Sequence, residues 1–331
     1  MSSSPALDTI RLDARRLASD GAWPAVRTML APLATDELRD GELALLYAEA
    51  SLRTGDARDA CAWLERIQAM LAAAPDRATQ RRGVNMLGAA AHAMGRLDDA
   101  ARAFSRALEL ATQADDLLIL AQASNNLGAI ANVRGQHEVA LWHYRIALPT
   151  LQRLGQPRRL AEAYHNMAIT GRDLGELDEA DEHERQAIDY AMDAGDARLV
   201  AMGRVGRAEI AMRRGDAALA EMTASLAADE LGSLGDPLNE SDARRLVGAA
   251  RAAQGLASEA LLAFAEALAI ADQRGYVLNR AEILRDRIDA SGALGAHADA
   301  RRDATEALRI FTELGATAET ERLGRRIAAL P

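Results

Sequence analysis

Glycine recurs every 40 residues along most of this 331-residue chain, and this period constrains the fold more than any other feature. The series consists of Gly55, Gly95, Gly135, Gly175, Gly215, Gly255 and Gly295. Alanine follows each of these glycines after five residues, from Ala60 to Ala300, and a second glycine series runs from Gly155 to Gly315 with the same period. A fixed period of roughly 20 to 50 residues is typical of a repeat architecture.

Each 40-residue unit is predicted to be a pair of helices joined by tight turns. Alanine and leucine, the main apolar residues of the chain, are strong helix formers. A glycine suits the end of a helix because it enters the left-handed region without strain. The recurring alanines let two helices approach closely, and the bulky Phe104, Tyr144 and Phe264 fill the space beside them. The unit is therefore helix, glycine turn, helix, and a glycine or aspartate turn.

The repeated pattern resembles that of a known family. It occurs as Leu87-Gly88, Gly95, Ala100, Phe104 and Ala107, and again as Leu127-Gly128, Gly135, Ala140, Tyr144 and Ala147. This arrangement resembles the tetratricopeptide repeat, although three units depart from it at the Leu-Gly pair, as Met167-Ala168, Arg207-Ala208 and Arg287-Ile288. The period of 40, rather than the usual ~34, resembles the long-helix subclass of kinesin light chains, Pins-type adaptors and bacterial Rap-type receptors. The resemblance implies a concave groove that binds peptides or protein partners.

The expected fold class is all-α, a right-handed α-solenoid of about eight antiparallel helix hairpins with a C-terminal capping helix. We expect a single superhelical domain over residues 1–331. It begins with an irregular N-terminal hairpin at 5–33, continues with seven repeats over 35–315, and ends with the capping helix at 317–330. No separate DNA-binding domain fits in front of such an array, which argues against direct DNA regulation.

Composition excludes several classes of protein. The 39 basic and 49 acidic residues give a net charge of −10, which disfavours a nucleic-acid-binding protein. All basic residues are arginine, so lysine-dependent chemistry is excluded, and the Ala, Arg, Asp and Gly bias is typical of a bacterial genome rich in GC. We find neither a signal peptide nor a membrane span, so a cytoplasmic protein that does not contact membranes is expected.

The register of the repeat assigns side chains to the partner-binding face. In stacked hairpins the first helix of each unit lines the concave groove, so fixed positions of the period point into it. These positions give the candidate partner-binding residues Asn85, Asn125, Asn126, Asn132, His165, Asn166, Arg172, Glu209, Arg213, Arg245 and Arg285.

The asparagines are the sharpest feature of this set. A side-chain amide can both donate to and accept from a peptide backbone. Asn126 and Asn166 match the Asn-Leu-Gly segment that clamps ligands in the long-repeat family, so the resemblance implies a peptide clamp around residues 125–172. The alternative is that these asparagines bond neighbouring helices within the stack.

The arginines are a second candidate feature. Arg172, Arg213, Arg245 and Arg285 would make the C-terminal half of the groove basic. Because arginine pairs with carboxylates in a bidentate manner, a partner segment carrying Asp, Glu or a C-terminal carboxylate would fit. The alternative is pairing within the chain with Glu209, Asp242, Glu282 or Asp289.

Nothing in the sequence favours an enzyme, a metal site or a cofactor. The six histidines lack metal-ligand spacing, and His143 and His183, at equivalent positions, are a weak metal pair at best. Cys61 stands among apolar residues and is expected to be packed, and as the sole cysteine it forms no intramolecular disulfide.

The favoured function is therefore a non-enzymatic scaffold or adaptor that binds a peptide or protein partner in its groove. The alternatives are a regulatory protein that senses a ligand or signal peptide by a change of superhelical pitch, and a self-assembling structural protein.

Overall fold

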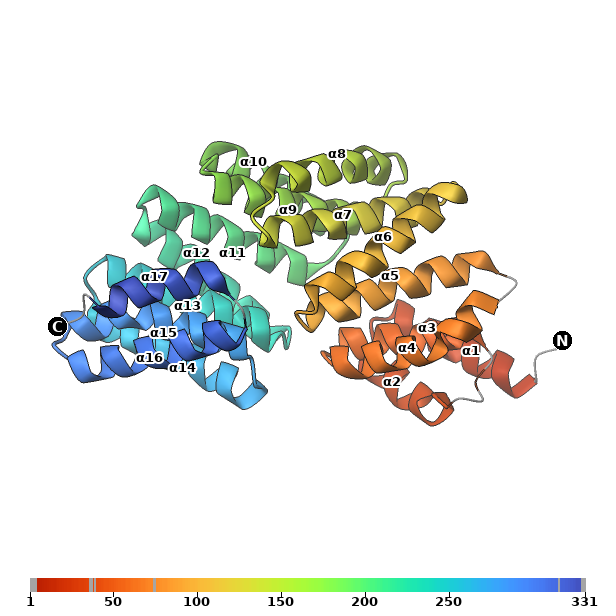
Figure 1. Cartoon of the computed structure of the whole chain (residues 1–331), viewed down its shortest axis with the longest axis horizontal. Coiled ribbons are helices and arrows are strands. Elements are labelled where there is room, and N and C mark those ends of the chain that lie inside the picture. The colour runs from red at the N-terminus through yellow and green to blue at the C-terminus, as the bar shows by residue number, and fades with distance from the viewer. Residues whose placement is uncertain (1–4, 36–37, 39, 74–75, 315, 329–331) are drawn as a thin grey trace. The chain divides into compact units, whose positions relative to one another are not determined.

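The computed structural model describes residues 5–35, 38, 40–73, 76–314 and 316–328 (Figure 1). Within these residues all regular secondary structure is helical. The predicted all-α class and the pairing of consecutive helices are confirmed, since the helices pack on one another in chain order. No described helix has the length and apolar character needed to cross a membrane.

The chain divides into two compact units, residues 1–156 and 157–331. The first contains α1 (Pro5–Ser19), α2 (Trp23–Leu30), the 3₁₀ helix η1 (Ala31–Leu33), α3 (Gly41–Arg53), α4 (Ala57–Ala73), α5 (Arg77–Ala93), α6 (Leu97–Gln113), α7 (Leu117–Val133) and α8 (His137–Arg153). The second contains α9 (Pro157–Leu174), α10 (Leu177–Asp193), α11 (Ala197–Arg214), α12 (Ala217–Ser233), α13 (Pro237–Ala253), α14 (Ala257–Arg274), α15 (Val277–Ala293), α16 (His297–Glu313) and α17 (Thr317–Ala328).

Each unit is built of two layers of helices. The first helices of successive hairpins contact one another, as α3 with α5 and α5 with α7 in the first unit, and α9 with α11, α11 with α13 and α13 with α15 in the second. Within each unit, a second helix that is followed by a first helix packs between the first helix before it and the one after it, as α12 does between α11 and α13. The odd-numbered helices from α3 onward thus form a continuous layer within each unit, and the even-numbered helices cover it.

The turns take the conformation that the glycine period predicts. All seven glycines of the main series have positive φ, and Gly215, at φ 82°, ends α11 in the left-handed conformation. Asp115, with φ 51°, is the non-glycine residue that shares this region within the described parts of the chain. It stands 40 residues before Gly155, where the sequence predicts an aspartate turn. A short polar side chain tolerates this conformation better than a branched one.

The hairpins are held together by glycines that lie under aromatic rings. A Cβ atom added at Gly128 would lie 2.5 Å from Cε1 of Tyr144, which is fully buried. Gly88 lies in the same way under Phe104, and Gly248 under Phe264. In these three hairpins the first helix has a glycine at the contact, and the missing side chain leaves room for an aromatic ring of the second helix.

This contact predicts the effect of a one-carbon change. We expect Gly128→Ala to lower the free energy of unfolding by roughly 1–3 kcal/mol, because the new methyl group must displace a buried ring. Gly292 is a helical glycine with no atom within 4 Å of an added Cβ. Gly292→Ala should therefore leave stability unchanged or raise it by up to about 1 kcal/mol. Chemical denaturation of both variants checks the difference, and equal effects would show that ring contact is not the cause.

Candidate functional site

The candidate asparagines of the first unit differ in how they are held. Asn85 on α5 is only 8% exposed, and its Nδ2 donates to Oε1 of Gln122 on α7 at 3.2 Å. Asn125 on α7 is equally buried. Asn132, also on α7, has its Oδ1 atom 2.9 Å from Nδ1 of His137 on α8. Asn126 is half-buried and makes no hydrogen bond through its side chain within the described residues. The side chains of Asn85 and Asn132 thus form hydrogen bonds between residues of the helical array, whereas the side-chain amide of Asn126 forms none within the described residues.

His165 on α9 forms a pair with a carboxylate that the sequence analysis missed. Its Nδ1 lies 2.9 Å from Oε1 of Glu184 on α10, and Glu184 is only 1% exposed. Burial alone would lower the pKa of His165, but the charge and hydrogen bond of Glu184 outweigh it and raise that pKa. Burial raises the pKa of Glu184 above its usual range, partly opposed by the charge of His165.

Space for Glu184 comes from two glycines of the next hairpin. A Cβ atom at Gly206 would lie 2.0 Å from Oε1 of Glu184, and one at Gly203 would lie 3.5 Å from Oε2. Glu184 occupies the register position of Phe104 and Tyr144, 80 and 40 residues earlier. That coincidence with a ring position is the signal that could have revealed a buried carboxylate from the sequence.

A chain of alternating arginines and carboxylates joins the first helices of the second unit. We call this set the arginine–carboxylate chain: Arg172 of α9, Glu209 of α11, Arg245 of α13, Asp286 and Arg285 of α15, and Glu319 of α17. Arg172 pairs with Glu209, and Nη2 of Arg245 lies 3.6 Å from Oε1 of Glu209. Arg285 reaches Glu319 at 3.2 Å.

Arg245 is the most deeply buried member of this chain, with 8% of its surface exposed. Its Nη1 donates to Oδ2 of Asp286 at 2.6 Å, and its Nη2 lies 2.8 Å from Oδ1 of Asp242. Burial lowers the pKa of Arg245, but the neighbouring carboxylates outweigh it and raise the pKa. Arg172 and Arg245 thus pair within the chain with Glu209 and Asp242, as the alternative predicted, whereas Arg285 pairs with Asp286 and Glu319, which the sequence analysis did not name. Arg213 is exposed and has no ion pair within the described residues.

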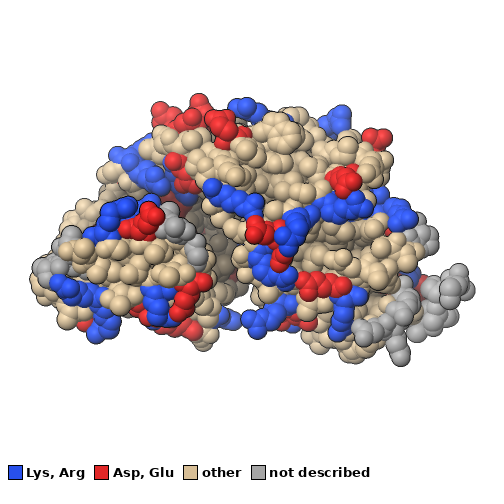
Figure 2. All heavy atoms as spheres, viewed as in Figure 1, with Lys and Arg blue, Asp and Glu red and all other residues tan. Residues whose placement is uncertain are grey.

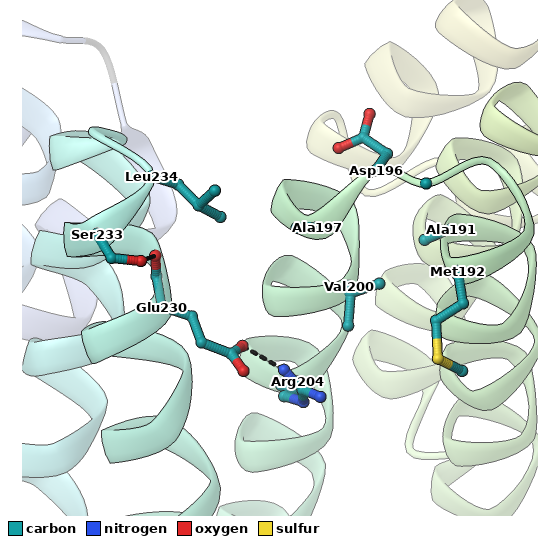
Figure 3. A pocket seen from close by; sticks show the side chains of 10 residues that line it. Ala191, Met192, Asp196, Ala197, Val200, Arg204, Glu230, Ser233 and Leu234 are labelled. Atoms are coloured by element: carbon teal, nitrogen blue, oxygen red, sulfur yellow. Dashed lines mark hydrogen bonds and ion pairs between the residues drawn. The ribbon is translucent and has the colours of Figure 1, made fainter.

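A hollow of about 450 Å³ opens at the ends of α10 and α12, and the sequence analysis did not predict it (Figure 3). Its apolar lining includes Met192, Val200 and Leu234, and Arg204 of α11 pairs with Glu230 of α12 beside them. Exposed leucines and methionines are scattered over the whole chain, so no sequence signal distinguishes those of the hollow.

No group of three His, Cys, Asp or Glu side chains in the described residues is placed to hold a metal ion. Cys61 is 2% exposed, and burial raises the pKa of its thiol above the ordinary value. The expectation that Cys61 is packed is confirmed.

The buried pair predicts an asymmetry between single and double variants. We expect His165→Leu to lower the free energy of unfolding by roughly 3–5 kcal/mol, because it leaves the carboxylate of Glu184 buried without a partner. Adding Glu184→Leu should recover most of this loss. Because Glu184 raises the pKa of His165, protonation of His165 stabilises the folded chain fully below the ordinary pKa of histidine, and this contribution is lost as the pH rises through the raised pKa. Burial raises the pKa of Glu184, so the stability linked to its protonation likewise falls as the pH rises. Denaturation between pH 5 and pH 8 should therefore show a flatter pH dependence for the double variant, and an equal slope would contradict the assignment.

Comparison with known proteins supports the fold. Residues 119–193 match the family model of the tetratricopeptide repeat. No curated protein matches the chain by sequence.

Several solved structures share the architecture at low identity. A Rap protein complexed with competence and sporulation factor is 13% identical, aligned over 99% of this chain and 98% of its own, with a TM-score of 0.69. The Rap conjugation gene regulator of plasmid pLS20, in complex with the Phr* peptide, is 14% identical over 85% of this chain and 76% of its own, with a TM-score of 0.65. Aspartyl phosphate phosphatase F from Bacillus subtilis is 15% identical over 100% of this chain and 94% of its own, with a TM-score of 0.55.

The repeat pattern, the paired helices, the family match over residues 119–193 and the fold match along the chain agree with one another. The chain is therefore an array of paired helices in which residues 119–193 match the tetratricopeptide repeat.

Proposed function

We propose that this protein is a regulatory sensor that binds a short peptide along its layer of first helices. The observation that carries the proposal is the fold match with a Rap protein complexed with competence and sporulation factor, which spans nearly the full length of both chains. A second similar structure holds the Phr* peptide. These matches favour peptide sensing over the general adaptor that the sequence first favoured.

Asn126 is the side chain best suited to hold the peptide. It lies on a first helix, is half-buried, and keeps an amide that no described residue engages. Such an amide can donate to a peptide carbonyl and accept from a peptide N–H at once. Asn166, which the sequence predicts as a second peptide-binding residue, occupies the equivalent register position in the second unit.

The arginine–carboxylate chain is the proposed route by which binding alters the protein. It joins α9, α11, α13, α15 and α17, so a change in the angle between two neighbouring first helices has to break or re-form an ion pair. Half-buried ion pairs have discrete arrangements and do not stretch continuously. A peptide that favours one arrangement would therefore shift the population of the whole unit.

The remaining functional expectations stay predictions. A non-enzymatic role is proposed from the lack of any catalytic arrangement in the sequence, whereas one similar structure is an aspartyl phosphate phosphatase. The partner is proposed to be a peptide or a protein, and no nucleic acid is expected from the net charge of −10.

The clamp is tested with a random hexapeptide library. The full chain is incubated with the library, and the peptides that it retains are identified by mass spectrometry. We expect Asn126→Ala to weaken binding of the best retained peptide at least about fivefold, because the two hydrogen bonds of one amide are lost, each worth about 0.5–1.5 kcal/mol.

The matched control is Gln152→Ala, which removes an exposed amide from the second helix α8. Helical circular dichroism should be unchanged in both variants. Retention of no peptide by the wild-type chain would refute peptide sensing, and equal binding by the Asn126→Ala variant would refute the role of Asn126 alone.

A further inference from the structure

The outer face of the second helices carries a pattern that the proposed function does not use. Three positions of each second helix, spaced i, i+3 and i+7, lie on one side of the helix. From α4 onward they are Asp59, Ala62 and Arg66 in α4; Asp99, Arg102 and Arg106 in α6; Val139, Trp142 and Ile146 in α8; Glu179, Glu182 and Gln186 in α10; Leu219, Met222 and Leu226 in α12; Glu259, Leu262 and Glu266 in α14; and Asp299, Arg302 and Glu306 in α16. In this set α8 and α12 alone are apolar at all three positions.

These two apolar faces are exposed to solvent. We call Val139, Trp142 and Ile146 the α8 stripe, and Trp142 is 55% exposed. The α12 stripe consists of Leu219, Met222 and Leu226, which are 43%, 66% and 51% exposed. Each helix buries its opposite face, where small alanines pack against the first helices. Neither stripe is therefore needed for the hairpin itself, whereas the equivalent positions of the other second helices from α4 onward are polar or charged except at Ala62 and Leu262.

The net charges beside the two stripes have opposite signs. Arg145 and Arg153 of α8 are exposed and form no ion pair or hydrogen bond within the described residues, although most arginines of the chain do. The described residues of α12 include no basic side chain, and Asp229, one turn beyond Leu226, is exposed and unpaired there. Glu138, beside Val139, is the exposed carboxylate of α8, so the α8 stripe is flanked by two free guanidinium groups and one carboxylate, and the α12 stripe by a free carboxylate.

The hollow described above extends the surface of α12. Glu230, which lines the hollow, follows Leu226 by about one turn on the same helix (Figure 3). Its apolar wall, with Met192 and Leu234, lies at the C-terminal end of the α12 stripe. The acceptor surface therefore combines a flat apolar stripe with a recess. Large aromatic side chains in such recesses dominate the free energy of many interfaces.

We propose that the α8 stripe of one copy of this protein docks on the α12 stripe of a second copy, with Trp142 as the anchor. A pairing of α12 with α12 would place like carboxylates together, and a pairing of α8 with α8 would oppose four guanidinium groups. The mixed pairing alone covers both apolar stripes and sets opposite charges side by side. The space-filling view shows charged residues of both signs distributed among uncharged residues, which are tan (Figure 2).

The size of the stripes sets the expected strength of this contact. Three partly exposed side chains on each side form the core of an interface well below the ~800 Å² per partner of a standard complex. We therefore expect weak association, with a dissociation constant in the range of roughly 10 to 100 µM, and a decrease in affinity with salt because the flanking charges are exposed.

Mixing two surface variants of the full-length protein tests the proposal. Trp142→Glu places a carboxylate in the α8 stripe, and Met222→Arg places a guanidinium group in the α12 stripe, so each variant alone should remain monomeric in sedimentation velocity between about 5 and 200 µM. An equimolar mixture should associate, because the first variant keeps an intact α12 stripe and the second an intact α8 stripe. The wild type should show a sedimentation coefficient that rises with concentration.

Arg102→Glu is the matched control, since it introduces a carboxylate at the same register of α6. It should associate like the wild type, and circular dichroism should confirm the fold of every variant. The proposal is overturned if the wild type stays monomeric over the whole range, if the mixture does not associate, or if one variant alone still associates. Because both stripes lie on second helices, peptide binding by the first helices can succeed or fail independently of this result.

Discussion

The close approach of the two helices within a hairpin is the constraint on which the other features depend. Glycine faces an aromatic ring in three hairpins, as Gly88 with Phe104, Gly128 with Tyr144 and Gly248 with Phe264. Alanine stands at both positions in the fifth hairpin, as Ala208 and Ala224, and the seventh reverses the sizes with Ile288 and Ala304. In four of these five hairpins a large side chain on one helix faces a small one on the other, and interiors packed to crystal-like density tolerate such exchanges when the total volume is preserved. The Ala208–Ala224 pair departs from this rule, because both side chains are small.

Two hairpins bury a pair of charged or titratable side chains where the other hairpins have apolar contacts. In the fourth hairpin Glu184 stands at the ring position and pairs with His165, while Gly203 and Gly206 leave room for its carboxylate. In the seventh, Asp303 is only 2% exposed and accepts two hydrogen bonds from Arg287, at 2.6 and 2.7 Å. A buried charge pair contributes little net stability compared with an apolar pair of equal volume. These two hairpins, both degenerate at the Leu-Gly pair, therefore retain titratable groups at positions that packing alone would fill with apolar side chains.

The sequence predicts the fold well and the site only in part, for physical reasons. A glycine every 40 residues specifies both the helix ends and the register, so the helices, the turns and the aspartate turn at Asp115 follow from local conformational preference. The sequence does not predict which charged side chains pair, because Arg245 interacts electrostatically with four carboxylates on three helices. Which of them it engages depends on distances between helices, and no period in one chain encodes these. The hollow beside α12 is unpredictable for the same reason, since three separate helices line it.

The fixed register of the repeat also gives the layer of first helices and the layer of second helices different surface properties. In the second unit, the first helices are joined by ion pairs from Arg172 to Glu319, so a ligand that binds this layer acts on several helices at once. On the outer sides of the second helices, Glu266 and Glu306 pair with Arg244 and Arg280 of the first helices. The outer positions of α8 and α12 instead carry apolar side chains such as Trp142 and Met222. Binding that must alter the protein is therefore best placed on the first layer. Association between copies is best placed on the second, where a new contact leaves the stack undisturbed.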